Sequence, residues 1–192
     1  MIKNLFAITF LSLSLSFISN ISFAQNIQQQ STEIQQLINN KKYNEANQKL
    51  NYLLSKPENS RNAKLLFLQG LLFTELNEID AAIKVFTEIT HFYPELPEPY
   101  NNLAVLYAKQ NQLERAKIAL EMAIQTHPNY ATAYENLGDI YIQLANQAYN
   151  QALLLKNNSS KSLQNKLLLI KDLKDLKDLK DLKDLKDLSK NN

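Results

Sequence analysis

The sequence predicts an all-α fold, a solenoid of stacked helical hairpins. A set of apolar and small residues recurs at a spacing of 34 along the 192-residue chain. The chain's only two glycines occupy the same position of that repeat. Self-similarity at a fixed spacing of about 20 to 50 residues is typical of proteins in which each unit packs against its neighbours.

Each repeat unit is predicted to be a pair of helices. The first-helix residues Tyr100, Leu103 and Tyr107 recur as Tyr134, Leu137 and Tyr141. The second-helix residues Ala82, Phe86, Ile89 and Pro94 recur as Ala116, Leu120, Ala123 and Pro128. Spacings of three and four residues place each set on one face of its helix. The pattern therefore predicts hairpins whose cores lie between the paired helices.

Gly70 and Gly138 both fall on the one small position of the first helix. A glycine there lets the paired helix approach closely, because a side chain would hold the two backbones apart. We expect both glycines to have this role.

The spacing and the order of residue classes closely resemble the tetratricopeptide repeat (TPR). The resemblance implies a right-handed solenoid in which the first helices line an inner, concave face. The domain is expected over residues 25–160. Its units are expected at about residues 27–60, 63–96, 97–130 and 131–157, the last of them degenerate.

The fourth unit departs from the pattern because the turn between its helices is missing. In the second and third units, the last aromatic residue of the first helix precedes the first alanine of the second helix by nine residues. In the fourth unit, Ala145 follows Tyr141 by only four residues, and no Gly or Pro lies between Tyr141 and Ala152. Good helix formers fill this stretch. The sequence therefore predicts one long, fused last helix over about residues 132–156.

Residues 161–192 are predicted to form a low-complexity C-terminal tail. Six tandem Lys-Asp-Leu triplets occupy residues 171–188. In an α-helix, a period of three rotates the leucines by about 60° per triplet, so they wind around the helix and form no single stripe. We favour a solvated, partly helical tail, and a functional coiled coil is the alternative.

Residues 1–24 have the pattern of a secretory signal peptide. Lys3 gives the segment a positively charged N-terminus, and an apolar run follows over residues 5–18. Ser22-Phe23-Ala24 then forms a small-x-small cleavage site. We expect export across the inner membrane of a bacterium, a periplasmic location, and no membrane insertion once the signal is removed. An uncleaved anchor is the alternative, but the apolar run is shorter than the roughly 20 residues that a membrane-spanning helix needs.

Composition argues against several classes of function. The formal net charge of +2 falls to +1 without Lys3, so the chain has no long-range attraction for nucleic acid. It has no Cys, which removes thiolate metal sites and Cys nucleophiles. His91 and His127 lie at the ends of second helices, where the helix dipole favours a partly cationic side chain. We therefore expect no catalytic residues, no metal site and no cofactor.

The binding site is predicted on the first helices, at the positions between their core residues. Because the resemblance implies that these helices line a concave groove, we predict partner contacts from Phe67, Leu71, Asn101, Asn102, Val105, Lys109, Glu135, Asn136 and Asp139. The predicted groove grades from apolar at its Phe67 end to acidic at its Glu135 end. A peptide with both apolar and basic residues would suit it best.

Asn102 and Asn136 occupy equivalent positions in consecutive units. In TPR proteins, an Asn at this position commonly bonds the backbone of an extended peptide, because an amide carries both donors and an acceptor. The alternative is that Asn is merely tolerated at a solvent-facing position.

The resemblance implies a protein–protein interaction scaffold of the bacterial cell envelope, which binds a protein or an extended peptide in its concave groove. The alternative is a self-assembling structural protein. It would form a homodimer through the long fourth-repeat helix and the tail.

Removal of the first 24 residues should be detectable in the mature protein, because the sequence before Gln25 fits a signal-peptidase cleavage site. Mass spectrometry of envelope fractions should find Gln25 at the N-terminus. An intact Met1 in those fractions would contradict the signal-peptide prediction.

Overall fold

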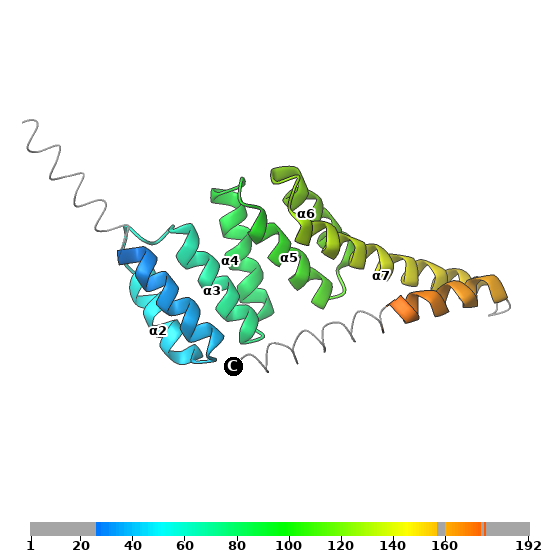
Figure 1. Ribbon diagram of the computed structural model, residues 1–192, viewed down its shortest axis with the longest axis horizontal. Helices are drawn as coiled ribbons and strands as arrows, with labels where there is room; N and C mark the ends of the chain where they lie inside the picture. Colours follow the sequence, from blue (N-terminus) through cyan, green and yellow to red (C-terminus); the bar gives the residue numbers. More distant parts are fainter. Residues whose placement is uncertain (1–25, 157–159, 174, 176–192) are drawn as a thin grey trace, which may run out of the picture.

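The computed structural model describes residues 26–156, 160–173 and 175, and these residues form helices joined by short turns, with no strand among them. The first helix spans residues 26–39. It is followed by α2 (Tyr43–Leu54), α3 (Ala63–Glu75), α4 (Ile79–Phe92), α5 (Pro97–Lys109), α6 (Leu113–Thr126) and α7 (Ala131–Leu155). A C-terminal helix covers residues 161–173. Successive helices stack in chain order (Figure 1), which confirms the predicted all-α solenoid.

A left-handed residue ends the first helix of each of the first three hairpins. Lys41, Asn77 and Asn111 have φ values of 59°, 58° and 57°. The following residue donates its N–H to the carbonyl five residues earlier, as Glu78 N does to Phe73 O at 2.8 Å. This is the Schellman arrangement, which satisfies the last carbonyls of a helix and reverses the chain. The second helix of each unit then begins within two residues.

The long helix α7 runs without a break for 25 residues. The position one repeat after Asn111 is Ala145. Alanine is the best helix former and pays a steric cost in the left-handed conformation, so the chain has no residue suited to end the helix there. The prediction of one long last helix is confirmed. Its second half projects beyond the hairpin of α5 and α6 (Figure 1).

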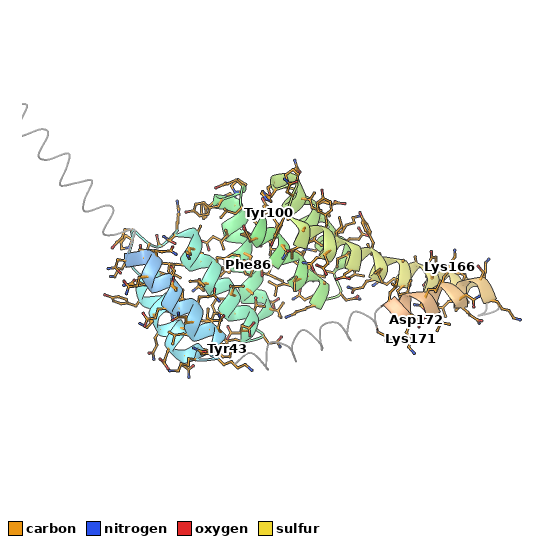
Figure 2. The ribbon with its side chains drawn as sticks, viewed as in Figure 1. Tyr43, Phe86, Tyr100, Lys166, Lys171 and Asp172 are labelled. Carbon is orange, nitrogen blue, oxygen red and sulfur yellow. The ribbon has the colours of Figure 1, made fainter. Side chains whose placement is uncertain are left out.

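Two apolar clusters hold the solenoid together. The N-terminal cluster joins the first helix, α2 and α3 around the fully buried Leu50. The larger cluster extends from α3 to α7 around Phe86 and Leu120, and Figure 2 shows Phe86 inside the stack. The half-buried Leu71 packs against both clusters, so it joins the first hairpin to the rest.

The two glycines have different surroundings. A Cβ added at Gly70 would lie 2.7 Å from Phe86 Cζ, closer than carbon atoms can pack, so Gly70 permits the approach of α4 as predicted. A Cβ added at Gly138 would have no such neighbour within 4 Å. The prediction of a close contact at Gly138 is therefore wrong. Because α7 continues where the other units turn back, no second helix packs on this glycine.

The C-terminal helix runs back along the second half of α7 (Figure 1). Lys166 Nζ lies 5.0 Å from the centroid of the Tyr149 ring, at the position labelled in Figure 2. Ile170 is buried, and Leu163 is half-buried. The predicted low-complexity tail therefore begins with a packed helix.

Two predicted segments lie outside the described residues. They are the signal peptide at residues 1–24 and the rest of the tail, which comprises residue 174 and residues 176–192. Among the residues that are described, none of the helices combines the length and the apolar character needed to span a membrane.

Replacing Gly70 with Ala should lower the free energy of unfolding by about 1–3 kcal/mol, because the added methyl group would press on the Phe86 ring. Gly138→Ala is the matched control, since it makes the same change in open space. This control should be neutral or stabilise by up to about 1 kcal/mol through helix propensity. Urea unfolding at equilibrium measures both, and equal losses would contradict the packing described for Gly70.

Candidate functional site

A cleft of about 350 Å³ lies between α5 and α7, the first helices of consecutive units. Its apolar lining consists of Ala104, Val105, Ala108, Leu120 and Ile140. Its polar lining consists of Lys109, Asn136, Asp139 and Gln143. Four of the residues predicted for partner binding therefore line this cleft: Val105, Lys109, Asn136 and Asp139.

Small side chains on α5 leave the space for the cleft. Ala104 and Ala108 lie four residues apart, so both are on one face of the helix. Ala104, Ala108 and Gln143 are not among the nine predicted contacts. A pair of alanines at helical spacing, opposite polar residues of the next unit, is the signal that points to such a hollow.

Asn101 does not face the groove, contrary to the prediction. Its side chain is only 8% exposed, and its Oδ1 accepts a 2.7 Å hydrogen bond from Asn136 Nδ2. The bond joins α5 to α7 across one repeat. Asn136 therefore has a structural role at the edge of the cleft, because a buried amide needs a partner.

Asn102 is half-buried, and its side chain bonds its own helix. Asn102 Nδ2 donates to Glu98 O at 2.8 Å, one turn earlier in α5. Asn102 and Asn136 occupy equivalent repeat positions, but only Asn136 lines the cleft. The structure therefore does not bring them together as a matched pair.

The predicted apolar end of the groove lies largely within the core. Phe67 is half-buried, and its ring packs edge-on against Phe86 with the centroids 5.6 Å apart. Leu71 packs against both core clusters. Glu135 is exposed on α7 and does not line the cleft. These three residues present little or no surface to the cleft between α5 and α7.

The cleft combines an apolar floor with hydrogen-bonding groups on its rim. The amide of Gln143 offers two donors and an acceptor, Lys109 offers a cation, and Asp139 offers an acceptor of opposite charge. This set can bind the backbone and side chains of an extended chain. The described residues contain no cluster of three or more His, Cys, Asp or Glu able to hold a metal ion.

Two residues with a raised pKa lie near the cleft-forming helices: Tyr130 directly before α7, and Lys117 on α6. Burial, with a smaller effect of the Glu98 carboxylate, raises the pKa of Tyr130. A hydrogen bond to Glu114, whose Oε2 is 2.9 Å from Lys117 Nζ, raises the pKa of Lys117. Both shifts move the pKa away from neutrality, where an acid–base catalyst would titrate. They keep Tyr130 neutral and Lys117 cationic at pH 7.

The central part of the chain is similar in sequence to a known repeat. Residues 73–138 match the Tetratricopeptide repeat family. The chain is similar to the Tetratricopeptide repeat domain-containing protein PYG7, chloroplastic, of Arabidopsis thaliana, with 36% identity over 70 residues. That match covers 34% of this chain and 23% of the Arabidopsis protein. The chain thus spans less than a quarter of this relative's length.

Solved structures show the same fold. The crystal structure of MamA protein superposes with a TM-score of 0.53 and 19% identity, over 78% of this chain and 85% of that chain. The first TPR domain of the human RPAP3 protein gives a TM-score of 0.53 and 19% identity, over 68% and 94% of the two chains. The described chain is therefore a TPR-like solenoid, with TPR sequence over residues 73–138.

Replacing Asn136 with Ala should lower the free energy of unfolding by about 1–3 kcal/mol, because the buried Asn101 amide would lose its partner. Asn102→Ala is the matched control. It removes the same group from the equivalent repeat position and should cost less than about 0.5 kcal/mol beyond its effect on helix propensity. Equilibrium urea unfolding distinguishes them, and a larger loss for Asn102→Ala would contradict the bonding described here.

Proposed function

We propose that this chain is a protein–protein interaction scaffold of the bacterial cell envelope, which binds a protein or an extended peptide in the cleft between α5 and α7. The observation that carries the proposal is the cleft itself, an open space between the first helices of two repeats with an apolar floor and amide groups on its rim. In this proposal the chain has no catalytic activity of its own.

The chemistry of the cleft supports an extended peptide as the ligand. Val105 is exposed and apolar, so burying it against a ligand side chain removes apolar surface from water. Gln143 can pair with a peptide N–H or C=O whatever the peptide's sequence. Asp139 favours a ligand with a basic side chain, although Lys109 on the opposite wall balances its charge. A peptide with both apolar and basic residues can therefore pair with Val105 and Asp139.

The proposed envelope location rests on the first 24 residues of the sequence. Their positive charge, apolar run and small-x-small cleavage site match a signal peptide. A scaffold without Cys needs no disulfides and folds through its apolar core alone.

Self-association is the second candidate, and one feature favours it. The second half of α7 and the C-terminal helix form a distal hairpin, whose outer surface carries Leu154, Leu155, Leu168, Leu169 and Leu173, all between 52% and 78% exposed. Two such hairpins could bury these leucines against each other as a four-helix bundle. Exposed apolar patches of this kind are typical of interaction surfaces.

Replacing Val105 with Arg should weaken peptide binding about tenfold or more, as expected for a contact at the centre of a binding site. Ile118→Arg is the matched control, because Ile118 is an exposed β-branched residue of α6 outside the cleft. Fluorescence anisotropy with a library of peptides rich in apolar and basic residues measures the affinity.

Equal affinities for the two variants would contradict the cleft as the binding site. No peptide binding, together with a mass that doubles with concentration in light scattering, would favour self-association.

A further inference from the structure

Charge is distributed unevenly along the sequence. Residues 26–140 contain ten Lys or Arg and thirteen Asp or Glu, which gives a net charge of −3. Residues 141–171 contain four lysines and no acidic residue, which gives a net charge of +4. These residues make up most of the distal hairpin, and the first acidic residue after them is Asp172. The distal hairpin is therefore the basic end of the molecule.

Two of the four lysines lie at the tip of the distal hairpin. Lys156 directly follows α7, Lys161 begins the C-terminal helix, and both are exposed. Lys166 Nζ lies 5.0 Å from the centroid of the Tyr149 ring, and this contact relates the level of one helix to that of the other. Because both antiparallel helices rise by about 1.5 Å per residue, a step of five residues along each brings Lys161 to the level of Leu154. The two lysines therefore flank the end of α7.

Exposed leucines lie beside these lysines. Leu154 and Leu155, in the last turn of α7, are 63% and 78% exposed. The distal hairpin projects beyond α5 and α6 (Figure 1), so the solenoid leaves this end open to a large surface. We call Leu154, Leu155, Lys156 and Lys161 the hairpin tip. It combines apolar surface with positive charge.

The charge of the hairpin tip argues against a second copy of the chain as its partner. A two-fold dimer places the same surface patch of both chains together. Pairing two tips in this way would bring four lysines together and supply no carboxylate, and like charges in contact repel each other. The surface that covers the tip must therefore be acidic and must also accept leucine side chains.

A bilayer with anionic lipids meets both conditions. Its headgroups carry negative charge, and leucines that enter about 5–10 Å reach the boundary with the acyl chains. Lysine stems extend along this apolar layer while their ammonium groups stay at the level of the headgroups. A protein partner would need an acidic rim around an apolar pocket shaped to a convex tip, whereas a bilayer offers this layering at every point of its surface.

We propose that the hairpin tip docks on the surface of a bilayer that contains anionic lipids. Leu154 and Leu155 enter the boundary between headgroups and acyl chains, and the two lysines of the tip pair with lipid phosphates. Lys166 lies about 7.5 Å behind Lys161 by helical rise, so it adds to the attraction within one Debye length. The contact is peripheral and spans no part of the bilayer. It is independent of peptide binding in the cleft.

Co-sedimentation with lipid vesicles tests the docking. The chain that begins at Gln25 is used, because the apolar run before it would itself bind lipid. Affinity should be about tenfold or more higher for phosphatidylcholine vesicles with about one-third phosphatidylglycerol than for phosphatidylcholine alone. Raising the salt from about 0.1 M to 1 M should remove most of this difference, because it screens the lysines from the headgroups.

Two pairs of variants locate the contact. Lys161→Glu should weaken binding to the anionic vesicles about tenfold or more, because it replaces attraction with repulsion at the surface. Lys84→Glu makes the same change at an exposed lysine of α4 and should have an effect of less than about twofold. Leu155→Ser should also weaken binding about tenfold, and Ile118→Ser on α6 is its control. Circular dichroism of each variant checks that the helices are kept.

Three results would overturn the proposal. Equal affinity for vesicles with and without phosphatidylglycerol would mean that the lysines do not meet headgroups. Equal losses for Lys161→Glu and Lys84→Glu would mean that another part of the chain meets the bilayer. No binding to either vesicle, together with a mass in light scattering that rises with concentration and does so less in Leu155→Ser, would assign the hairpin tip to a second copy of the chain.

Discussion

The architecture depends on the left-handed turn that ends the first helix of each hairpin. Lys41, Asn77 and Asn111 adopt this conformation at nearly equal spacing, and each is followed by a second helix that folds back on the first. The fourth repeat has Ala145 at this position and lacks the residues of the turn. Because alanine favours the helix and is strained at positive φ, the chain continues straight. One local conformational preference thus decides between a hairpin and a 25-residue helix.

The missing turn also determines which surfaces remain available. A straight α7 moves the second half of the fourth unit away from the stack, so Gly138 loses the neighbour that Phe86 provides for Gly70. The helix that does fold back, at residues 161–173, covers only the distal half of α7. The cleft between α5 and α7, the exposed Tyr134 and Tyr141 of α7 and the leucine-rich distal hairpin are therefore all found at this end of the solenoid.

The sequence predicts well those features that depend on short spacings within the chain. Repeat length, helix pairing and the fused last helix follow from apolar periodicity and from the absence of turn residues after Tyr141. It predicts poorly the features that depend on contacts between units. Asn101 is adjacent to Asn102, and periodicity alone placed both in the groove, but Asn101 is buried by its bond to Asn136 of the next unit. Gly138 matches the motif, but no second helix packs against it, because α7 continues as one helix.

Polar contacts about one repeat apart explain how the straight helix stays in line with the stack. Asn136 bonds Asn101 of the preceding unit at 2.7 Å near the start of α7. Farther along, Gln147 Nε2 donates to Asn111 Oδ1 at 3.2 Å. Asn111 is the left-handed residue that turns the preceding unit, so its side chain contacts α7 just beyond the place where α7 would itself have turned. The Gln147–Asn111 bond is exposed and stabilises the fold only slightly, but in a solenoid each unit contacts only its neighbours. A second point of attachment therefore sets the direction of α7 and with it the position of the distal hairpin.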